Sequence, residues 1–224
     1  MKYSTNGKGI LVCFVGIDGS GKTTLANSLI ASCEQHGVRC RYLWGGFNSS
    51  FTIFKPFMAV AKGTVFRGNR FMEESRTKGR VVRSTLLSTI YQYLMLVDYV
   101  FQAFFKIRVP LAFGRNVICD RYIYDLIASI AVILAYPGSR THSLLDRSLA
   151  VVPKPDLVFL VDVPEELARK RKDDTIALDS LPLRREIYLQ MARQHGMTIL
   201  DGTSDPDELS RLATSKVLQY VAGE

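Results

Sequence analysis

The feature that most constrains this chain is a glycine-rich segment placed between an apolar run and a helical pattern. Residues 16–23 read GIDGSGKT, which matches the phosphate-binding pattern G-x-x-x-x-G-K-[ST] at every fixed position. The apolar run at 10–15 is typical of a strand buried on both faces, and Leu25, Leu29 and Ile30 follow at helical spacing. A chance glycine turn would not require both of these neighbours. The segment therefore predicts a P-loop, in which backbone N–H groups and the positive end of a helix face a phosphate.

The polar residues of this loop suit a nucleoside triphosphate and its magnesium ion. Lys22 supplies a point charge for the β- and γ-phosphates of ATP, and the Thr23 hydroxyl is a ligand for Mg²⁺. A P-loop alone does not distinguish a small-molecule kinase from a GTPase or a motor ATPase, so the other strand ends must decide. The residues expected to hold ATP at this loop are Gly16, Asp18, Gly19, Ser20, Gly21, Lys22, Thr23 and Thr24.

Strand patterns and helical segments alternate along the whole chain, and no linker interrupts them. One long helix is expected at 84–107, before Pro110 and Gly114 break its pattern. This alternation predicts an α/β fold: a single P-loop domain over residues 1–224, with three α/β/α layers and a five-stranded parallel sheet. Ligands of such sheets bind beyond the carboxyl ends of the strands. The expected strands are 10–15, 38–44, 116–119, 156–161 and 197–200.

Two further strand ends carry charges that suit phosphoryl transfer. Asp120 and Arg121 follow the third strand: Asp120 could order Mg²⁺ through water or stabilise the loop, and Arg121 could hold an acceptor phosphate bidentately, unless the two form an ordinary surface ion pair. A basic run at 169–172 follows the fourth strand. Within a lid at about 168–183, Arg169 and Arg171 would stabilise the transferring phosphoryl group and exclude water. The alternative is a solvated helix face.

The composition narrows the class of partner. A net charge of +8 fits nucleic acid, an anionic membrane or an anionic small substrate. No nucleic-acid-binding motif is present, and Gln92, Asp98 and Gln102 interrupt the long apolar helix, which favours a buried core helix over a membrane span. We therefore expect an anionic small molecule as the partner. The four cysteines form no C-x-x-C pair, and Cys13 and Cys119 lie in apolar strands, which favours buried thiols and a cytoplasmic protein.

The chain resembles the thymidylate kinase group of nucleoside monophosphate kinases in the order of five segments. These are the P-loop segment 14–24, VICDRY at 117–122, DLVFLVDVPEE at 156–166, LRREIY at 183–188 and DGTS at 201–204. The resemblance implies a P-loop kinase fold with a short basic lid. It implies transfer of the γ-phosphoryl of ATP to a nucleoside monophosphate, with dTMP as the first candidate. It also implies that Asp18 approaches the acceptor's sugar, that Arg121 binds its phosphate, that Arg169 and Arg171 are lid arginines, and that Thr203 lies beside adenine. A homodimer through the long helices is a further implication.

The acceptor half departs from the pattern of that group. The family's Arg-Glu-Pro-Gly-Gly segment is replaced by YLWGGF at 42–47, and the base-recognising arginine of the long helix is replaced by Tyr99. Trp44 and Tyr99 could still stack on a base. The sequence does not indicate a role for the acceptor-side region at about 45–83. Two alternatives remain open: a kinase of the same kind acting on another nucleotide, a nucleoside, a sugar or a lipid-linked alcohol, and an NTP-binding regulatory switch.

Overall fold

The strands and helices alternate as the sequence pattern predicts. The computed structural model describes residues 8–46, 85–171 and 180–223, so the acceptor-side segment 47–84 and most of the lid lie outside the described residues. The strands are β1 (Leu11–Val15), β2 (Cys40–Trp44), β3 (Asn116–Asp120), β4 (Leu157–Asp162) and β5 (Thr198–Asp201). The helices are α1 (Lys22–Gln35), α4 (Thr85–Ala103), the π-helix η2 (Phe104–Arg108), α5 (Val109–Ala112), α6 (Ile123–Ile133), α7 (Gly138–Leu149), α8 (Glu165–Lys170), α9 (Leu181–His195) and α10 (Pro206–Ala222).

The five strands form one parallel sheet in the order β2-β3-β1-β4-β5. Its central strand β1 is fully buried, as its unbroken apolar run predicts. Because β1 lies between β3 and β4, the P-loop emerges between the ends of the two strands that carry Asp120 and Asp162. The α/β fold with a five-stranded parallel sheet is therefore confirmed.

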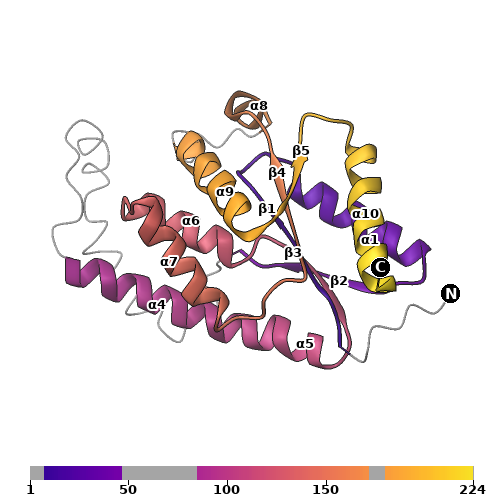
Figure 1. The fold of residues 1–224 in the computed structure, drawn as a ribbon, viewed down its shortest axis with the longest axis horizontal. Coiled ribbons are helices and arrows are strands. Elements are labelled where there is room, and N and C mark those ends of the chain that lie inside the picture. The colour runs from indigo at the N-terminus through magenta and orange to yellow at the C-terminus, as the bar shows by residue number, and fades with distance from the viewer. Residues whose placement is uncertain (1–7, 47–84, 172–179, 224) are drawn as a thin grey trace.

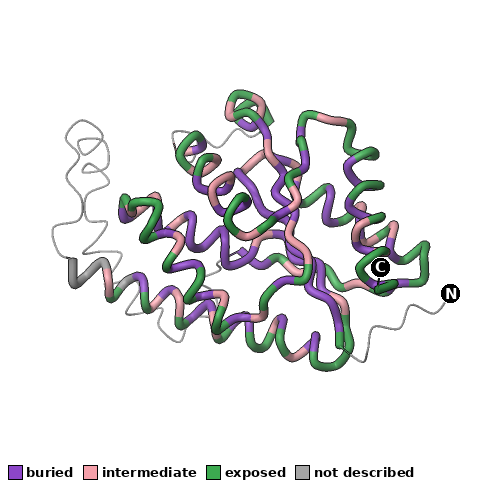
Figure 2. Tube along the Cα trace, viewed as in Figure 1, coloured by how far each residue is buried: buried purple, intermediate pink, exposed green. Residues whose placement is uncertain are grey.

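Helices cover both faces of the sheet and give it three layers (Figure 1). The helices α1 and α10 pack together on one face, where Leu29 and Val217 belong to one core cluster. The helices α4, α6, α7 and α9 lie on the other face, where Ile127 and Met191 belong to the second cluster. Buried residues follow the strands and the inward sides of these helices (Figure 2). Cys13 and Cys119 are fully buried in this core, as expected.

The long helix differs from its prediction near its end. A single helix was expected at 84–107, but α4 ends at Ala103 and continues through the π-helix η2 into α5, with Pro110 near the start of α5. Proline has no N–H to donate to the carbonyl of residue 106, so an α-helical bond is missing there, and a wider turn accommodates the gap. No helix in the described part of the chain is long and apolar enough to cross a membrane.

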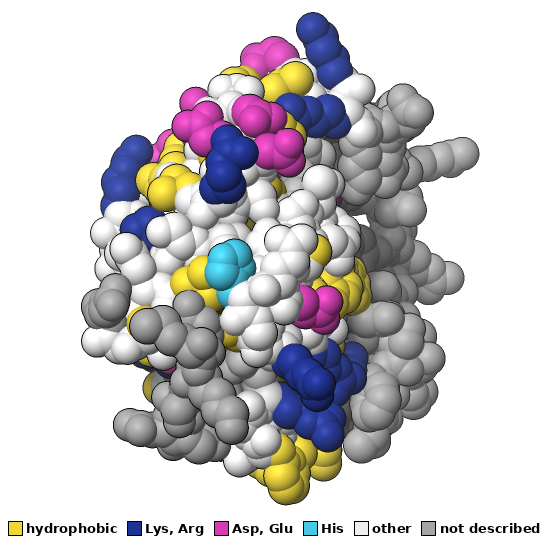
Figure 3. Space-filling view, turned by 90° about the vertical axis from the view of Figure 1, so that its right-hand side faces the viewer, with side chains coloured by type: hydrophobic (Ala, Val, Ile, Leu, Met, Phe, Trp, Pro, Cys, Tyr) yellow, Lys and Arg dark blue, Asp and Glu magenta, His cyan; other side chains and the backbone are white. Residues whose placement is uncertain are grey.

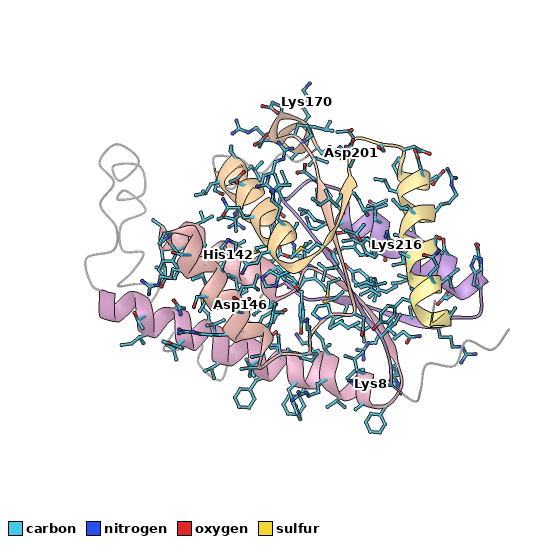
Figure 4. The ribbon with its side chains drawn as sticks, viewed as in Figure 1. Lys8, His142, Asp146, Lys170, Asp201 and Lys216 are labelled. Carbon is cyan, nitrogen blue, oxygen red and sulfur yellow. The ribbon has the colours of Figure 1, made fainter. Side chains whose placement is uncertain are left out.

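Basic side chains also gather away from the strand carboxyl ends. Figure 3 looks onto the side of the molecule that carries α1 and α10, and Lys and Arg side chains cluster at its lower edge, below mixed acidic and basic side chains at its upper edge. Lys8, at the lower end of the strands in Figure 4, lies at their amino ends, opposite the P-loop. Phosphate binding therefore accounts for only part of the net charge of +8.

Candidate active site

The P-loop has a backbone that only glycine adopts without strain. Gly16, Gly19 and Gly21 have φ angles of 140°, 81° and 94°. A Cβ added to Gly16 would lie 2.5 Å from the Val161 carbonyl oxygen, and one added to Gly19 would lie 2.6 Å from the Ala168 carbonyl oxygen. The loop is therefore packed against the backbones of β4 and α8, and its glycines satisfy both the turn and this close approach.

Lys22 is folded inward over the loop. Its Nζ donates to the Ile17 carbonyl at 2.6 Å and to Ser20 Oγ at 3.2 Å, and only 4% of the residue is exposed. Burial, and then the nearby Arg121 charge, lower the pKa of Lys22 to about 8. The loop thus holds a desolvated ammonium group whose two partners are weak acceptors compared with the phosphates of a nucleotide.

Thr23 and Asp120 form a pair suited to a magnesium ion. Thr23 Oγ1 donates to Asp120 Oδ2 at 2.5 Å, and the Tyr42 hydroxyl donates to the same oxygen at 3.1 Å. Asp120 is 1% exposed, and its Oδ1 has no hydrogen-bond partner among the described residues. In nucleotide sites Mg²⁺ takes one or two protein oxygens together with phosphate and water, so a hydroxyl beside an unsatisfied carboxylate oxygen fits it. Among the residues described, no group of three or more His, Cys, Asp or Glu could hold a metal.

Arg121 joins the P-loop to the end of β3. Its φ of 70° is left-handed, which is unusual for a residue with a side chain and places it directly beyond the sheet edge. One Nη group donates to Asp18 Oδ1 of the P-loop, and the other donates to Asp125 Oδ1 on α6 at 2.8 Å. Burial lowers the pKa of Arg121, but the two carboxylates outweigh this effect and raise the pKa above its ordinary value. The guanidinium is therefore a permanent cation fixed next to the phosphate loop.

Comparison with known proteins agrees with this geometry. The protein-family model described as Thymidylate kinase matches residues 71–212. The chain is 30% identical to a thymidylate kinase of Xanthomonas campestris pv. campestris strain B100, covering 96% of this chain and 85% of that protein. It is 28% identical to a thymidylate kinase of Fervidobacterium nodosum, covering 90% of this chain and 95% of that protein. It is also 29% identical to a probable thymidylate kinase of Metallosphaera sedula, covering 92% and 91% of the two chains.

The chain belongs to the thymidylate kinase family. The family is one of phosphotransferases that use ATP, so the resemblance inferred from the five sequence segments is confirmed. The match to the family model begins after the P-loop, but the alignment with the Xanthomonas campestris relative covers 96% of this chain and therefore includes the P-loop. The two halves of the expected site, the P-loop and the Asp120–Arg121 pair, are thus parts of one family frame.

The two aromatic residues expected beside the acceptor differ in exposure. Trp44, at the end of β2, is 44% exposed, and its ring lies against the backbone of Gly46. Tyr99, on α4, is only 4% exposed; its hydroxyl donates to the Gly45 carbonyl at 3.1 Å, and its ring packs edge-on against Tyr122. Both side chains therefore lie by the carboxyl end of β2, where the sequence analysis expects the acceptor to bind. Their roles stay predictions.

The described parts of the lid lie at the same end of the sheet. Lys170 of α8 and Asp201 of β5 both appear at the top of Figure 4. The guanidinium of Arg171 lies 3.4 Å from the Gly202 carbonyl, and Arg169 is exposed. Thr203, expected near adenine, is exposed and donates its N–H and hydroxyl to Asp201 Oδ1. Residues 172–179 of the expected lid lie outside the described residues, and the catalytic roles of Arg169 and Arg171 stay predictions.

Four residues of this site escaped the sequence analysis. Tyr42 contacts Asp120, Asp125 contacts Arg121, and Tyr188 donates to Asp125. The fourth, Arg185, forms a bidentate pair with Asp162 at the end of β4, which raises its pKa. The spacing of four residues between Arg121 and Asp125 at a helix start was a usable signal. The contacts of Tyr42, Tyr188 and Arg185 join segments that are distant in the sequence, so no local sequence pattern predicts them.

Proposed function

We propose that this protein is an ATP-dependent dTMP kinase, which transfers the γ-phosphoryl group of ATP to the phosphate of dTMP. The observation that carries the proposal is the ion pair between Arg121 and Asp18 of the P-loop, because it brings the cation expected to bind the acceptor beside the loop expected to bind ATP. Such reactions depend mainly on positioning and charge neutralisation, because little covalent chemistry is left to the protein. Family membership supports dTMP as the acceptor.

Each part of the site has a task in this reaction. The P-loop backbone and Lys22 bind the β- and γ-phosphates, and Lys22 exchanges its two carbonyl and hydroxyl partners for phosphate oxygens. Thr23 and Asp120 would hold Mg²⁺, which supplies charge neutralisation when bound. Arg121 would orient the acceptor phosphate, with Asp18 near the sugar, while Arg169 or Arg171 neutralises the transferred group and Thr203 lies beside adenine. The lid would exclude water, which otherwise takes the phosphoryl group.

The direct test is ATP consumption with Mg²⁺ against a panel of nucleoside monophosphates, each with a control lacking acceptor. We expect dTMP to stimulate ADP release well above that control. Stimulation by a different monophosphate would keep the reaction and change the acceptor. Release of ADP without any acceptor would instead support an NTP-binding switch.

A second candidate keeps the reaction and replaces dTMP. It is favoured by Tyr99, which stands where the family places a base-recognising arginine and whose hydroxyl is already bonded to Gly45. A pocket without that arginine could take another nucleotide, a nucleoside, a sugar or a lipid-linked alcohol. If ATP binds but no nucleoside monophosphate stimulates turnover, the panel should be extended to these hydroxyl acceptors.

The proposal includes a homodimer that pairs through α4 and α7. Exposed apolar side chains line a cavity of about 430 Å³ there: Tyr93, Val97 and Phe101 of α4, and Val151, which follows α7. A second copy would remove this surface from water. Sedimentation velocity at micromolar concentration should give a dimer, and Phe101→Glu should give a monomer; a monomeric wild type would contradict the proposal. A cytoplasmic location also stays a prediction, supported by the four free cysteines.

A further inference from the structure

Arg121 is held from two sides by carboxylates, and the two carboxylates differ in their surroundings. Asp18 lies on the P-loop with a fifth of its side chain exposed, where an acceptor could reach it. Asp125 lies in the first turn of α6, and only 6% of its side chain is exposed. The Asp125 contact therefore belongs to the core beneath the site.

Asp125 is itself held by a residue from another helix. Its Oδ1 accepts from Arg121 Nη1 at 2.8 Å and from the Tyr188 hydroxyl of α9 at 2.6 Å. Tyr188 is 1% exposed, and burial followed by the Asp125 charge raises the pKa of its hydroxyl, so it stays a proton donor. The other carboxylate oxygen, Oδ2, is buried and has no hydrogen-bond partner in the part of the chain that the structure describes.

We propose that Asp125 and Tyr188 are positioning residues that orient Arg121 for the acceptor's phosphate; this inference rests on the proposed function. A free arginine side chain has many rotamers, and binding a phosphate bidentately would have to immobilise it. The hydrogen bonds from Tyr188 and Arg121 to Asp125 fix the guanidinium before the acceptor binds. The entropy of the arginine side chain is therefore lost during folding and not on binding. Asp18 can turn to the acceptor's sugar while Asp125 keeps its ion pair with Arg121.

A purely structural contact does not explain the free-energy penalty of burying the Asp125 carboxylate. A buried carboxylate is stabilising only when its charge and its oxygens are satisfied, and here one oxygen is not. An apolar residue at position 125 would pack in the core without that penalty. The retained charge is explained if Asp125 acts on Arg121.

Two conservative variants test the proposal by steady-state kinetics with dTMP and ATP. Tyr188→Phe removes only the hydroxyl, and we expect the KM for dTMP to rise roughly fivefold, with kcat and the KM for ATP changed less than about twofold. Asp125→Asn keeps the shape and removes the charge, and we expect a rise of roughly tenfold or more. Tyr124→Phe is the matched control, since Tyr124 is a buried tyrosine on α6 that packs against His195 instead. It should leave all three constants unchanged.

A double-mutant cycle separates positioning from general support of the fold. In an Arg121→Lys background the guanidinium is gone, so Tyr188→Phe should no longer change the KM for dTMP. The same fivefold rise in both backgrounds, or equal rises in the KM values for dTMP and ATP, would overturn the proposal. A wild type that no nucleoside monophosphate stimulates would instead remove the proposed function, and this inference with it.

Discussion

The donor side and the acceptor side of this site are built from different materials. On the donor side the backbone makes the site: three glycines have positive φ, and two of them, Gly16 and Gly19, lie against the carbonyl oxygens of Val161 and Ala168. On the acceptor side the side chains make it: Arg121 is fixed by Asp18 and Asp125. A backbone site tolerates no added Cβ, whereas a side-chain site can be altered one hydrogen bond at a time.

This difference would explain why the sequence keeps the family's pattern in the P-loop and is expected to depart from it around the acceptor. Every thymidylate kinase binds the same phosphates of ATP, and a single stretch of nine residues supplies most of what that needs. The expected acceptor half draws on β2, α4, β3, α6 and α9, so an exchange such as the one expected at Tyr99 would leave the loop undisturbed. Four changes test how separate the two sides are.

The largest effect should come from Lys22→Met. Loss of the charge on the β- and γ-phosphates should lower kcat by roughly 10³-fold, comparable to the loss of other preorganised charges in phosphoryl transfer. The same change should stabilise the ligand-free fold, because burial and the Arg121 charge make the ammonium unfavourable there. Near-normal activity would remove the P-loop from the mechanism.

The stability effect of Lys22 has a definite pH dependence. With a folded-state pKa of about 8 against an ordinary 10.5, the unfolded chain binds more protons between these values, so the wild-type free energy of unfolding should rise with pH in that window. Below pH 8 the variant should be more stable by ~1–3 kcal/mol, and the difference should shrink towards pH 10. Urea unfolding of both proteins at pH 7 and pH 9.5 measures it.

The second effect belongs to the acceptor side. Arg121→Ala should weaken binding of the acceptor by ~2–4 kcal/mol, because it removes a charge-assisted pair and leaves Asp18 and Asp125 without their cation. The KM for ATP should change much less if the two sides are separate. An unchanged dTMP affinity would make Arg121 a structural residue, and an equal loss for ATP would break the comparison.

The sequence predicts the two sides unequally well. The sequence allowed us to identify the strands, the P-loop and the Asp120–Arg121 pair, because each depends on an apolar run or a motif of neighbouring residues. Tyr42 and Tyr188 were not, because their partners lie 78 and 63 residues away and only the folded sheet brings them together. The end of the long helix was missed for a local reason, since a proline can be absorbed by a π-turn as well as by a helix end.

The third prediction concerns the close contact between the P-loop and α8. Gly19→Ala would place a Cβ 2.6 Å from the Ala168 carbonyl oxygen at a φ of 81°, so we expect ~2–4 kcal/mol of lost stability together with weaker ATP binding. Gly37→Ala is the control: its φ of 78° is as strained, but its Cβ would meet nothing within 4 Å. It should cost ~1–2 kcal/mol and leave ATP binding intact. Equal losses in thermal unfolding and ATP titration would show that φ alone, and not the contact with α8, defines the loop.

The smallest effect should come from Tyr99→Phe, which separates the two contributions of this side chain. The hydroxyl bonds to Gly45, so its removal should lower the free energy of unfolding by about 1 kcal/mol. The ring stays in place against Tyr122, so the KM for dTMP should change by no more than about threefold and the KM for ATP not at all. Tyr93→Phe, the same change at a position of α4 that is exposed in the single chain, should alter neither KM. A large rise in the KM for dTMP with unchanged stability would mean that the hydroxyl leaves Gly45 to bind the acceptor, which would make Tyr99 the replacement for the missing arginine.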